Sequence, residues 1–210
     1  MFNPKEYDVI FFDFDGVVKE SVSVKTDAYA EIFSPYGSDL CEQIKSHHLA
    51  NGGMSRYEKI PLYLEWAGLE PKQATVKDFC SKFSSIVKDR VITSAWVPGV
   101  ENFLKSNKDN FIFVLVSATP QDELEDICKA LNLTDVFRKI FGAPNSKSDS
   151  IRRSLVDYKA SPSSCLMIGD AEVDWQAARA NEVHFILRKH QDSVATSVMK
   201  SANSITNFLS

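Results

Sequence analysis

Four aspartates in two distant parts of this chain stand where their carboxylates could act together. Asp13 and Asp15 are separated by one residue, so in an extended segment their side chains point the same way. Asp170 follows another apolar run, and Asp174 lies about one helical turn further on. Like charges repel unless a cation or a proton lies between them, and oxygen ligands without soft donors suit Mg²⁺. The sequence therefore predicts a magnesium site.

Two further polar residues could complete such a site. Ser117 can donate its hydroxyl group to an anionic oxygen, and Thr119 followed by Pro120 predicts a helix start with Thr119 as the N-cap. Free backbone amides at a helix start attract phosphate. Lys147 supplies a cation at a point of the chain between Ser117 and Asp170. Taken alone, Ser117 is typical of a turn and Lys147 of a solvated surface, so it is their combination that favours a phosphate site.

The elements that must position these residues alternate between strands and helices. Three apolar runs predict buried strands at residues 9–12, 111–116 and 165–168, and weaker runs lie at 139–141 and 184–187. Helical patterns separate them at 100–106, 121–131, 147–158 and 173–180. This alternation predicts an α/β fold with a Rossmann-like parallel sheet. Since ligands gather beyond the carboxyl ends of parallel strands, we expect the polar segments to meet at one edge.

The stretch between residues 19 and 95 interrupts this alternation. It has helical patterning, for example at 26–33 and 76–88, and no convincing strand. We therefore predict an α/β core domain formed by residues 1–18 and 96–210. An all-helical cap domain would be inserted into it at residues 19–95.

The composition excludes several classes of protein. The chain has 210 residues, of which 44% are hydrophobic and 25% charged, the balance of a protein with a buried core. Its 24 basic and 28 acidic residues give a net charge of −4, so neither nucleic acid nor an anionic membrane is expected as a partner. No apolar run is long enough for a membrane span, the first residues hold charges where a signal peptide needs an apolar stretch, and the four cysteines form no C-x-x-C pair. We expect a cytoplasmic protein with reduced thiols.

Together these segments resemble the four motifs of the haloacid dehalogenase superfamily of phosphotransferases. The helical insertion after the first motif is similar to the subgroup that contains phosphoglycolate phosphatases and β-phosphoglucomutases. Residues 51–56 resemble the substrate-facing cap loop of that subgroup. The matching segments are Asp13-Phe14-Asp15-Gly16-Val17 for the first motif, Ser117 for the second, Lys147 for the third, and Gly169-Asp170 with Asp174 for the fourth.

The resemblance implies a role for each matched residue. Asp13 would attack phosphorus and form an aspartyl-phosphate. Asp15 would protonate the leaving oxygen and then take a proton from the hydrolytic water. Mg²⁺ would bind the Asp13 carboxylate, the backbone carbonyl of Asp15 and the Asp170 carboxylate, with Asp174 beside it or as an occasional ligand. The phosphoryl oxygens would be held by Ser117, the backbone amide of Ala118 and Lys147.

Three residues of the predicted cap are candidates for binding the rest of the substrate. The run from Ser55 to Glu58 predicts a capping box, which would put Arg56 at the mouth of a helix. There Arg56 would clamp an anionic or hydroxyl-rich group, or form a surface salt bridge. Gly53 directly follows Gly52, and these two glycines either let the backbone approach a ligand or simply form a turn. Lys25 is expected to face the cleft, whereas the four histidines are expected to be surface or packing residues.

We therefore predict a Mg²⁺-dependent phosphatase acting on a small phosphate monoester, such as a sugar or carboxylate phosphate, as a monomer or homodimer. A phosphomutase of the β-phosphoglucomutase type is the alternative enzyme, although Glu20 and Lys25 stand where those mutases usually have Asp and His. A phospho-accepting signalling module is the alternative without enzymatic activity. The large insertion and the acid at Asp15 count against that module.

Overall fold

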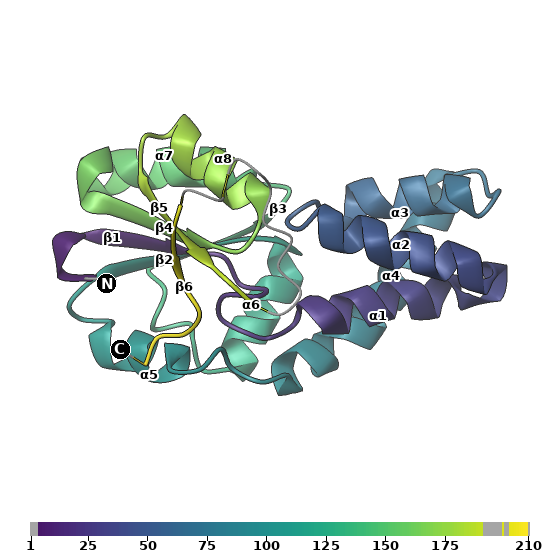
Figure 1. Cartoon of the computed structure of the whole chain (residues 1–210), viewed down its shortest axis with the longest axis horizontal. Helices are drawn as coiled ribbons and strands as arrows, with labels where there is room; N and C mark the ends of the chain where they lie inside the picture. Colours follow the sequence, from purple (N-terminus) through teal and green to yellow (C-terminus); the bar gives the residue numbers. More distant parts are fainter. Residues whose placement is uncertain (1–3, 191–198, 200–201, 210) are drawn as a thin grey trace.

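The chain folds around one six-stranded sheet, from which a bundle of four helices projects (Figure 1). The computed structural model describes residues 4–190, 199 and 202–209. The strands are all parallel and lie in the order β3-β2-β1-β4-β5-β6, which confirms the predicted α/β fold. The strands are β1 (Val9–Phe12), β2 (Ile112–Pro120), β3 (Lys139–Ala143), β4 (Cys165–Gly169), β5 (His184–Arg188) and β6 (Asn203–Ile205).

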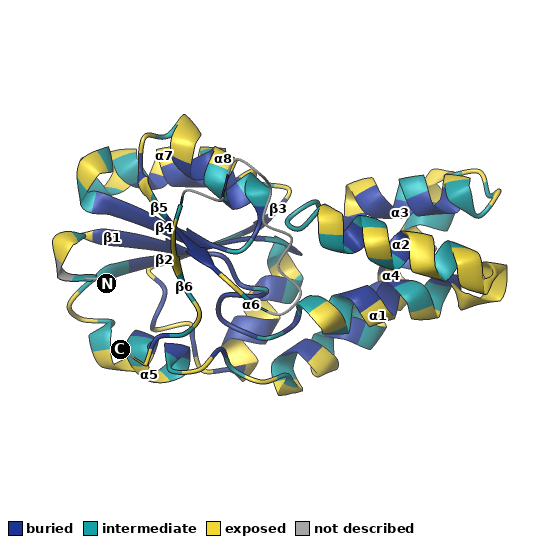
Figure 2. Cartoon of the chain, in the orientation of Figure 1, coloured by how far each residue is buried: buried dark blue, intermediate teal, exposed yellow. Residues whose placement is uncertain are grey.

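Helices cover both faces of this sheet. Successive side chains of a strand point to opposite faces, so Ile10 and Phe12 of β1 enter one hydrophobic cluster while Val9 and Phe11 enter the other. Figure 2 shows the strands as a buried layer between helices whose outer surfaces are exposed. The first cluster includes residues of α5 (Val100–Asn107) and α6 (Gln121–Ala130), and the second includes residues of α7 (Lys147–Tyr158) and α8 (Glu172–Ala180).

The remaining long helices form the projecting bundle, which we call the four-helix insertion. Its interior is aromatic, with Tyr29 and Phe83 rings 4.1 Å apart and Phe33 and Phe79 rings 5.0 Å apart between centroids. Among the helices of the described residues, none combines the length and the apolar character that a membrane crossing demands. The insertion consists of α1 (Val22–Phe33), α2 (Ser38–Ala50), α3 (Arg56–Trp66) and α4 (Gln73–Thr93).

The two chain crossings that join the insertion to the sheet lie side by side. The backbone N–H of Val97 donates to the carbonyl of Val18 over 3.1 Å, and that of Glu20 donates to the carbonyl of Ala95 over 2.9 Å. The insertion therefore enters and leaves through one paired segment, residues 18–20 and 95–97, which we call the neck. In Figure 1 the insertion extends beyond the end of the sheet at which the strands terminate.

The end of β2 differs from the sequence prediction. The strand continues to Pro120 and α6 begins at Gln121, so the prediction of Thr119 as an N-cap is wrong. Pro120 pairs with Ala143 of β3, and the Gln121 side chain accepts a hydrogen bond from the backbone N–H of Gly142 over 2.5 Å. Contacts with the neighbouring strand therefore override the local helix signal.

Candidate active site

Three carboxylates meet at the carboxyl end of the sheet. Asp13 directly follows β1, Asp170 directly follows β4, and Asp174 lies in the first turn of α8. Because β1 and β4 are paired neighbours, the residues that follow them are adjacent in space. One oxygen from each of the three side chains lies within 4.8 Å of the others. The sheet order reverses its direction at this pair of strands, which is where ligands of such sheets bind.

Lys147 lies between two of these carboxylates. Its Nζ is 2.8 Å from Oδ1 of Asp13 and 2.6 Å from Oδ1 of Asp174, and all three side chains are buried. Burial alone would lower the pKa of Lys147, but the two carboxylates outweigh it and raise that pKa, so the ammonium stays charged. Burial raises the pKa of Asp13 and of Asp174, and Lys147 opposes both shifts. One lysine thus partly compensates three acidic groups.

The same cluster has the donors that a hard divalent cation requires. Mg²⁺ prefers carboxylate oxygens and retains several waters, and three carboxylates against one ammonium leave negative charge for it to compensate. Gly16 makes room for this arrangement. Its φ of +76° is unfavourable for other residues, and a Cβ there would lie 2.5 Å from Oδ2 of Asp170. The residues present therefore fit a magnesium ion.

The carboxylate of Asp15 turns towards the insertion instead. It accepts hydrogen bonds from Ser21 Oγ over 2.6 Å and from Lys25 Nζ over 2.5 Å. Lys25 also donates to Thr119 Oγ1 over 2.8 Å. Burial raises the pKa of Asp15, but Lys25 and Ser21 together outweigh it and hold that pKa below its usual value. The Asp15 side chain is thus kept apart from the oxygens of the acidic cluster.

The segment after the apolar part of β2 is irregular. Its register against β3 shifts between Val116 and Pro120, and such irregularities are common beside active sites. Ser117 is buried in this segment and accepts a hydrogen bond from the backbone N–H of Thr119 over 3.1 Å. Ala118 and Thr119 contribute to the wall of the adjoining cavity.

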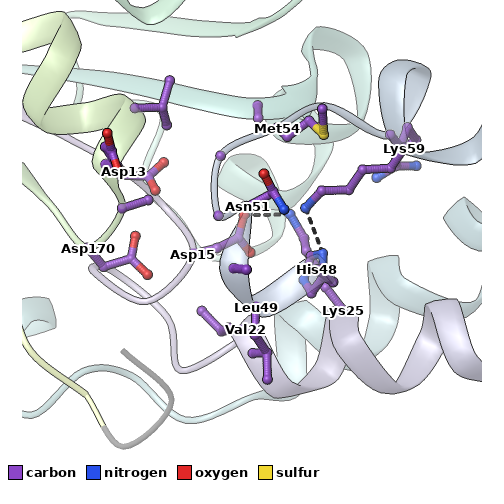
Figure 3. Close-up of a pocket in the computed structure, with 18 of the residues that line it drawn as sticks. Asp13, Asp15, Val22, Lys25, His48, Leu49, Asn51, Met54, Lys59 and Asp170 are labelled. Atoms are coloured by element: carbon purple, nitrogen blue, oxygen red, sulfur yellow. Dashed lines mark hydrogen bonds and ion pairs between the residues drawn. The ribbon is translucent and has the colours of Figure 1, made fainter. Parts of the chain in front are cut away.

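A cavity of about 510 Å³ separates the sheet edge from the insertion (Figure 3). Gly53 is in its wall with φ +79°, and a Cβ there would lie 2.1 Å from Cγ1 of Val173 and 3.8 Å from Nζ of Lys147. The loop at residues 51–54 therefore rests directly on the start of α8. The other lining residues that bear on the chemistry are Asp13, Asp15 and Asp170 at the sheet edge, and Lys25, His48, Asn51, Arg56 and Lys59 from the insertion.

Arg56 is engaged with the α/β part of the chain. Its guanidinium donates to both carboxylate oxygens of Glu123 on α6, over 2.9 Å and 2.6 Å. Both side chains are buried, and the guanidinium carbon lies 4.6 Å from the centroid of the Phe83 ring. Of the two roles expected for Arg56, the structure places it in a salt bridge, although a buried one rather than one at the surface.

His190 and Lys59 belong to the site but were not among the sequence candidates. His190 lies with Nε2 2.9 Å from Oδ2 of Asp170, so its prediction as a surface or packing residue is wrong. It follows β5 closely, and the strand-end rule that selected Asp13 could have selected it. Lys59 is buried in the cavity wall. Its signal was its spacing, because it shares a helix face with the buried Ile60 and Tyr63.

The fold and the site define an α/β enzyme with an acidic, oxygen-rich active site. The model of haloacid dehalogenase-like hydrolases matches residues 10–188. The chain belongs to this family, and it is therefore an enzyme of the hydrolase class. Among curated proteins, none matches the sequence.

Solved structures share the fold over nearly the whole chain. One is described as a predicted phosphoglycolate phosphatase from Haemophilus somnus, with a TM-score of 0.75, 16% identity, and coverage of 97% of this chain and 95% of that one. Another is a variant of CbbY from Rhodobacter sphaeroides in complex with xylulose 1,5-bisphosphate, with a TM-score of 0.76, 16% identity, and coverage of 96% and 95%. A predicted phosphatase from Clostridium acetobutylicum has a TM-score of 0.71, 20% identity, and coverage of 96% and 94%. At these identities the likeness concerns the fold.

Proposed function

We propose that the protein is a Mg²⁺-dependent phosphatase that hydrolyses a small phosphate monoester through an aspartyl-phosphate on Asp13. The observation that carries this proposal is the cluster of Asp13, Asp170 and Asp174 around Lys147 at the end of the sheet. Family membership supports it, and so do structural neighbours described as phosphatases. The neighbour that holds xylulose 1,5-bisphosphate supports a small phosphorylated substrate, such as a sugar or carboxylate phosphate.

The reaction would proceed in two displacements at phosphorus. A carboxylate oxygen of Asp13 attacks the phosphorus atom, the bond to the leaving oxygen breaks, and Asp15 gives that oxygen its proton. A water molecule then attacks the phosphorus of the aspartyl-phosphate while Asp15 takes the water proton, which releases phosphate and restores Asp13. The hydrogen bonds from Lys25 and Ser21 stabilise the Asp15 carboxylate, which suits its role as the base of the second step. For the first step Asp15 must carry a proton, and the negative charge of a bound phosphate monoester favours this, because a nearby like charge raises the pKa of a carboxyl group.

Other residues of the site would hold the phosphoryl group and the metal ion. Lys147 and Ser117, with the backbone amide of Ala118, would bind phosphoryl oxygens. The ion would be held by the Asp13 and Asp170 carboxylates and the Asp15 backbone carbonyl, with Asp174 beside them. When bound, Mg²⁺ would neutralise negative charge on the phosphoryl group.

The four-helix insertion would act as the cap of this enzyme. In this proposal residues 1–18 and 96–210 form the core domain, and residues 19–95 form the cap domain that closes over the substrate. The contact of Gly53 with Val173 and the buried pair of Arg56 with Glu123 support closure against the core. A closed cap excludes bulk water, which strengthens the electrostatic interactions around the phosphoryl group.

The test is release of inorganic phosphate from a panel of phosphorylated metabolites in the presence of Mg²⁺. We expect Asp13→Asn to lower the rate by at least about a thousandfold, because the variant lacks the attacking oxygen anion. Removal of Mg²⁺ with a chelator should abolish the activity, and added Mg²⁺ should restore it. Asp126→Asn, at an exposed position of α6, is the matched control and should keep the parental rate.

Three results would contradict this proposal. The first is an Asp13→Asn variant that retains the rate of the parent protein. The second is interconversion of sugar phosphate isomers with a bisphosphate activator, which would indicate a phosphomutase. The third is phosphorylated Asp13 that persists for many minutes with Mg²⁺ present, which would indicate a phospho-accepting signalling module.

A further inference from the structure

Lys59 differs from the other cationic side chains of the cavity wall because no carboxylate of the described residues pairs with it. The Lys25 ammonium is paired with Asp15, and the Arg56 guanidinium with Glu123. Within the described part of the chain, Lys59 takes part in no ion pair, and its polar partner is Nδ1 of His48, 2.8 Å from its Nζ. Lys59 is only 1% exposed, so water does little to compensate its charge.

The surroundings of Lys59 make an anion the missing partner. Lys25 on the neighbouring α1 adds positive charge, which Asp15 and Glu58 oppose, each more weakly. His48 on α2 is uncharged, because burial holds its pKa well below its usual value. The ring of Tyr29, 5.9 Å from Nζ of Lys59, supplies only a weak attraction. A buried ammonium without a counter-ion is unfavourable. An anionic group of a ligand would remove that penalty.

The cavity is polarised from one end to the other. Asp13 and Asp170 stand at the sheet edge, where the proposed metal ion and phosphoryl group would bind, whereas Lys59 and His48 stand on the opposite side (Figure 3). A molecule bound at the sheet edge by its phosphoryl group would therefore direct its other end towards Lys59. A volume of about 510 Å³ suits a short carbon chain between the two ends.

We propose that Lys59, positioned by His48, binds a second anionic group on the leaving portion of the substrate. The enzyme then selects small phosphate monoesters whose leaving group carries a carboxylate or a second phosphate. This inference rests on the proposed phosphatase function and narrows its substrate class. Lys59 is a specificity-determining residue in this scheme, and it takes no part in bond breaking.

The experiment measures binding, so it does not depend on turnover. Isothermal titration calorimetry with Mg²⁺ compares three non-hydrolysable probes: phosphonoacetate, propane-1,3-diphosphonate and the uncharged-tail analogue 2-hydroxyethylphosphonate. We expect the wild-type protein to bind phosphonoacetate, the diphosphonate or both at least about tenfold more tightly than the neutral analogue, as hydrogen bonds to charged groups are the strong ones. Tighter binding of phosphonoacetate would indicate that Lys59 binds a carboxylate, and tighter binding of the diphosphonate would indicate that it binds a second phosphate.

Two variants decide whether Lys59 causes the preference. Lys59→Met should lose the tenfold preference and keep the affinity for 2-hydroxyethylphosphonate within about twofold. Lys59→Gln serves the same purpose if the methionine variant does not fold. Lys45→Met removes a partly exposed lysine of α2 from outside the cavity wall, and it should retain the preference.

The inference is overturned if the wild-type protein binds the three probes equally. It is also overturned if a folded Lys59 variant weakens all three alike, because Lys59 would then only support packing. Should neither variant fold, the wild-type affinities alone decide. Failure of the phosphatase proposal appears separately, as absence of phosphate release by the wild-type protein or as an Asp13→Asn variant that retains the parental rate.

Discussion

At the scale of the residue, the burial of Lys59 in the cavity wall makes the stability of the ligand-free protein depend on pH. Burial first, and then the charge of Lys25, lower the pKa of Lys59 from 10.5 to about 7, against weaker opposition from Asp15 and Glu58. The unfolded chain keeps this proton up to the ordinary pKa of lysine. Between about pH 7 and pH 10.5 the folded protein thus binds fewer protons than the unfolded chain, and Lys59 makes stability rise with pH in that window.

Lys59→Met should remove the contribution of Lys59 to the rise in stability with pH. At pH 7 we expect the ligand-free variant to unfold at a higher urea concentration than the wild-type protein, because the buried charge is gone. The difference between the urea midpoints of the variant and the wild-type protein should become smaller as the pH approaches 10. Urea unfolding at pH 7, 8.5 and 10 measures it. His48 stays neutral in this range, since its pKa is lowered well below its usual value. A difference that is the same at every pH would contradict the prediction.

Site residues that are positioned by the end of a strand were predictable from the sequence. Residues whose role depends on a side chain far away in the sequence were not. Asp13 and Asp170 follow apolar strands and Ser117 follows the apolar part of β2, and parallel strands end at a common edge. The pair of Arg56 with Glu123 joins residues 67 positions apart on two helices, and no local pattern connects them. For Lys59 the only signal was its spacing on a helix face, and spacing does not show that a lysine lies in a cavity wall, since this depends on how α3 packs in the insertion.

At the scale of the element, the turn after β1 sets the position of the acidic cluster. Gly16 adopts φ +76° there, and any side chain would meet the carboxylate of Asp170. The turn thus allows the carboxylates of Asp13, after β1, and Asp170, after β4, to lie close together only when position 16 lacks a Cβ.

Gly16→Ala should therefore weaken Mg²⁺ binding. We expect at least a tenfold higher Mg²⁺ concentration for half-maximal phosphate release, because the new Cβ displaces Asp170. Gly37→Ala is the matched control, because Gly37 also has a positive φ of +112° but has nothing within 4 Å of its Cβ position. Equal Mg²⁺ requirements in the two variants would contradict the prediction.

The elements themselves were largely predictable, with instructive exceptions. The strong apolar runs at 9–12 and 165–168 became β1 and β4, because strands buried on both faces are continuously apolar. The Thr-Pro helix signal failed, because Pro120 pairs with Ala143 in β3. The three-residue strand β6 has no apolar run and forms through its pairing with β5.

At the scale of the whole molecule, two ion pairs on α6 join the insertion to the α/β part, in addition to the pair of Lys25 with Asp15. Arg56 binds Glu123 in a buried pair, and Lys88 on α4 binds Asp126 in an exposed one. Removing one partner of a buried pair costs about 3–5 kcal/mol, whereas an exposed pair contributes about 0–1 kcal/mol. Of the two pairs on α6, the buried one therefore contributes more to the contact between the insertion and the α/β part.

Glu123→Gln should let the insertion move away from the sheet, because Arg56 can then reach water. We expect a larger radius of gyration by small-angle X-ray scattering than for the wild-type protein. Asp126→Asn breaks the exposed pair and should leave the radius unchanged. Identical scattering from the two variants would show that the pair of Arg56 with Glu123 does not hold the insertion closed.

The paired backbone of the neck has a consequence for the history of such a protein. Since both ends of the inserted stretch meet at two hydrogen bonds, the number and length of its helices can change without altering how β1 aligns with β2. Descendants of one ancestral chain can thus exchange everything between these ends and acquire new preferences, while the aspartates beside the sheet are inherited intact.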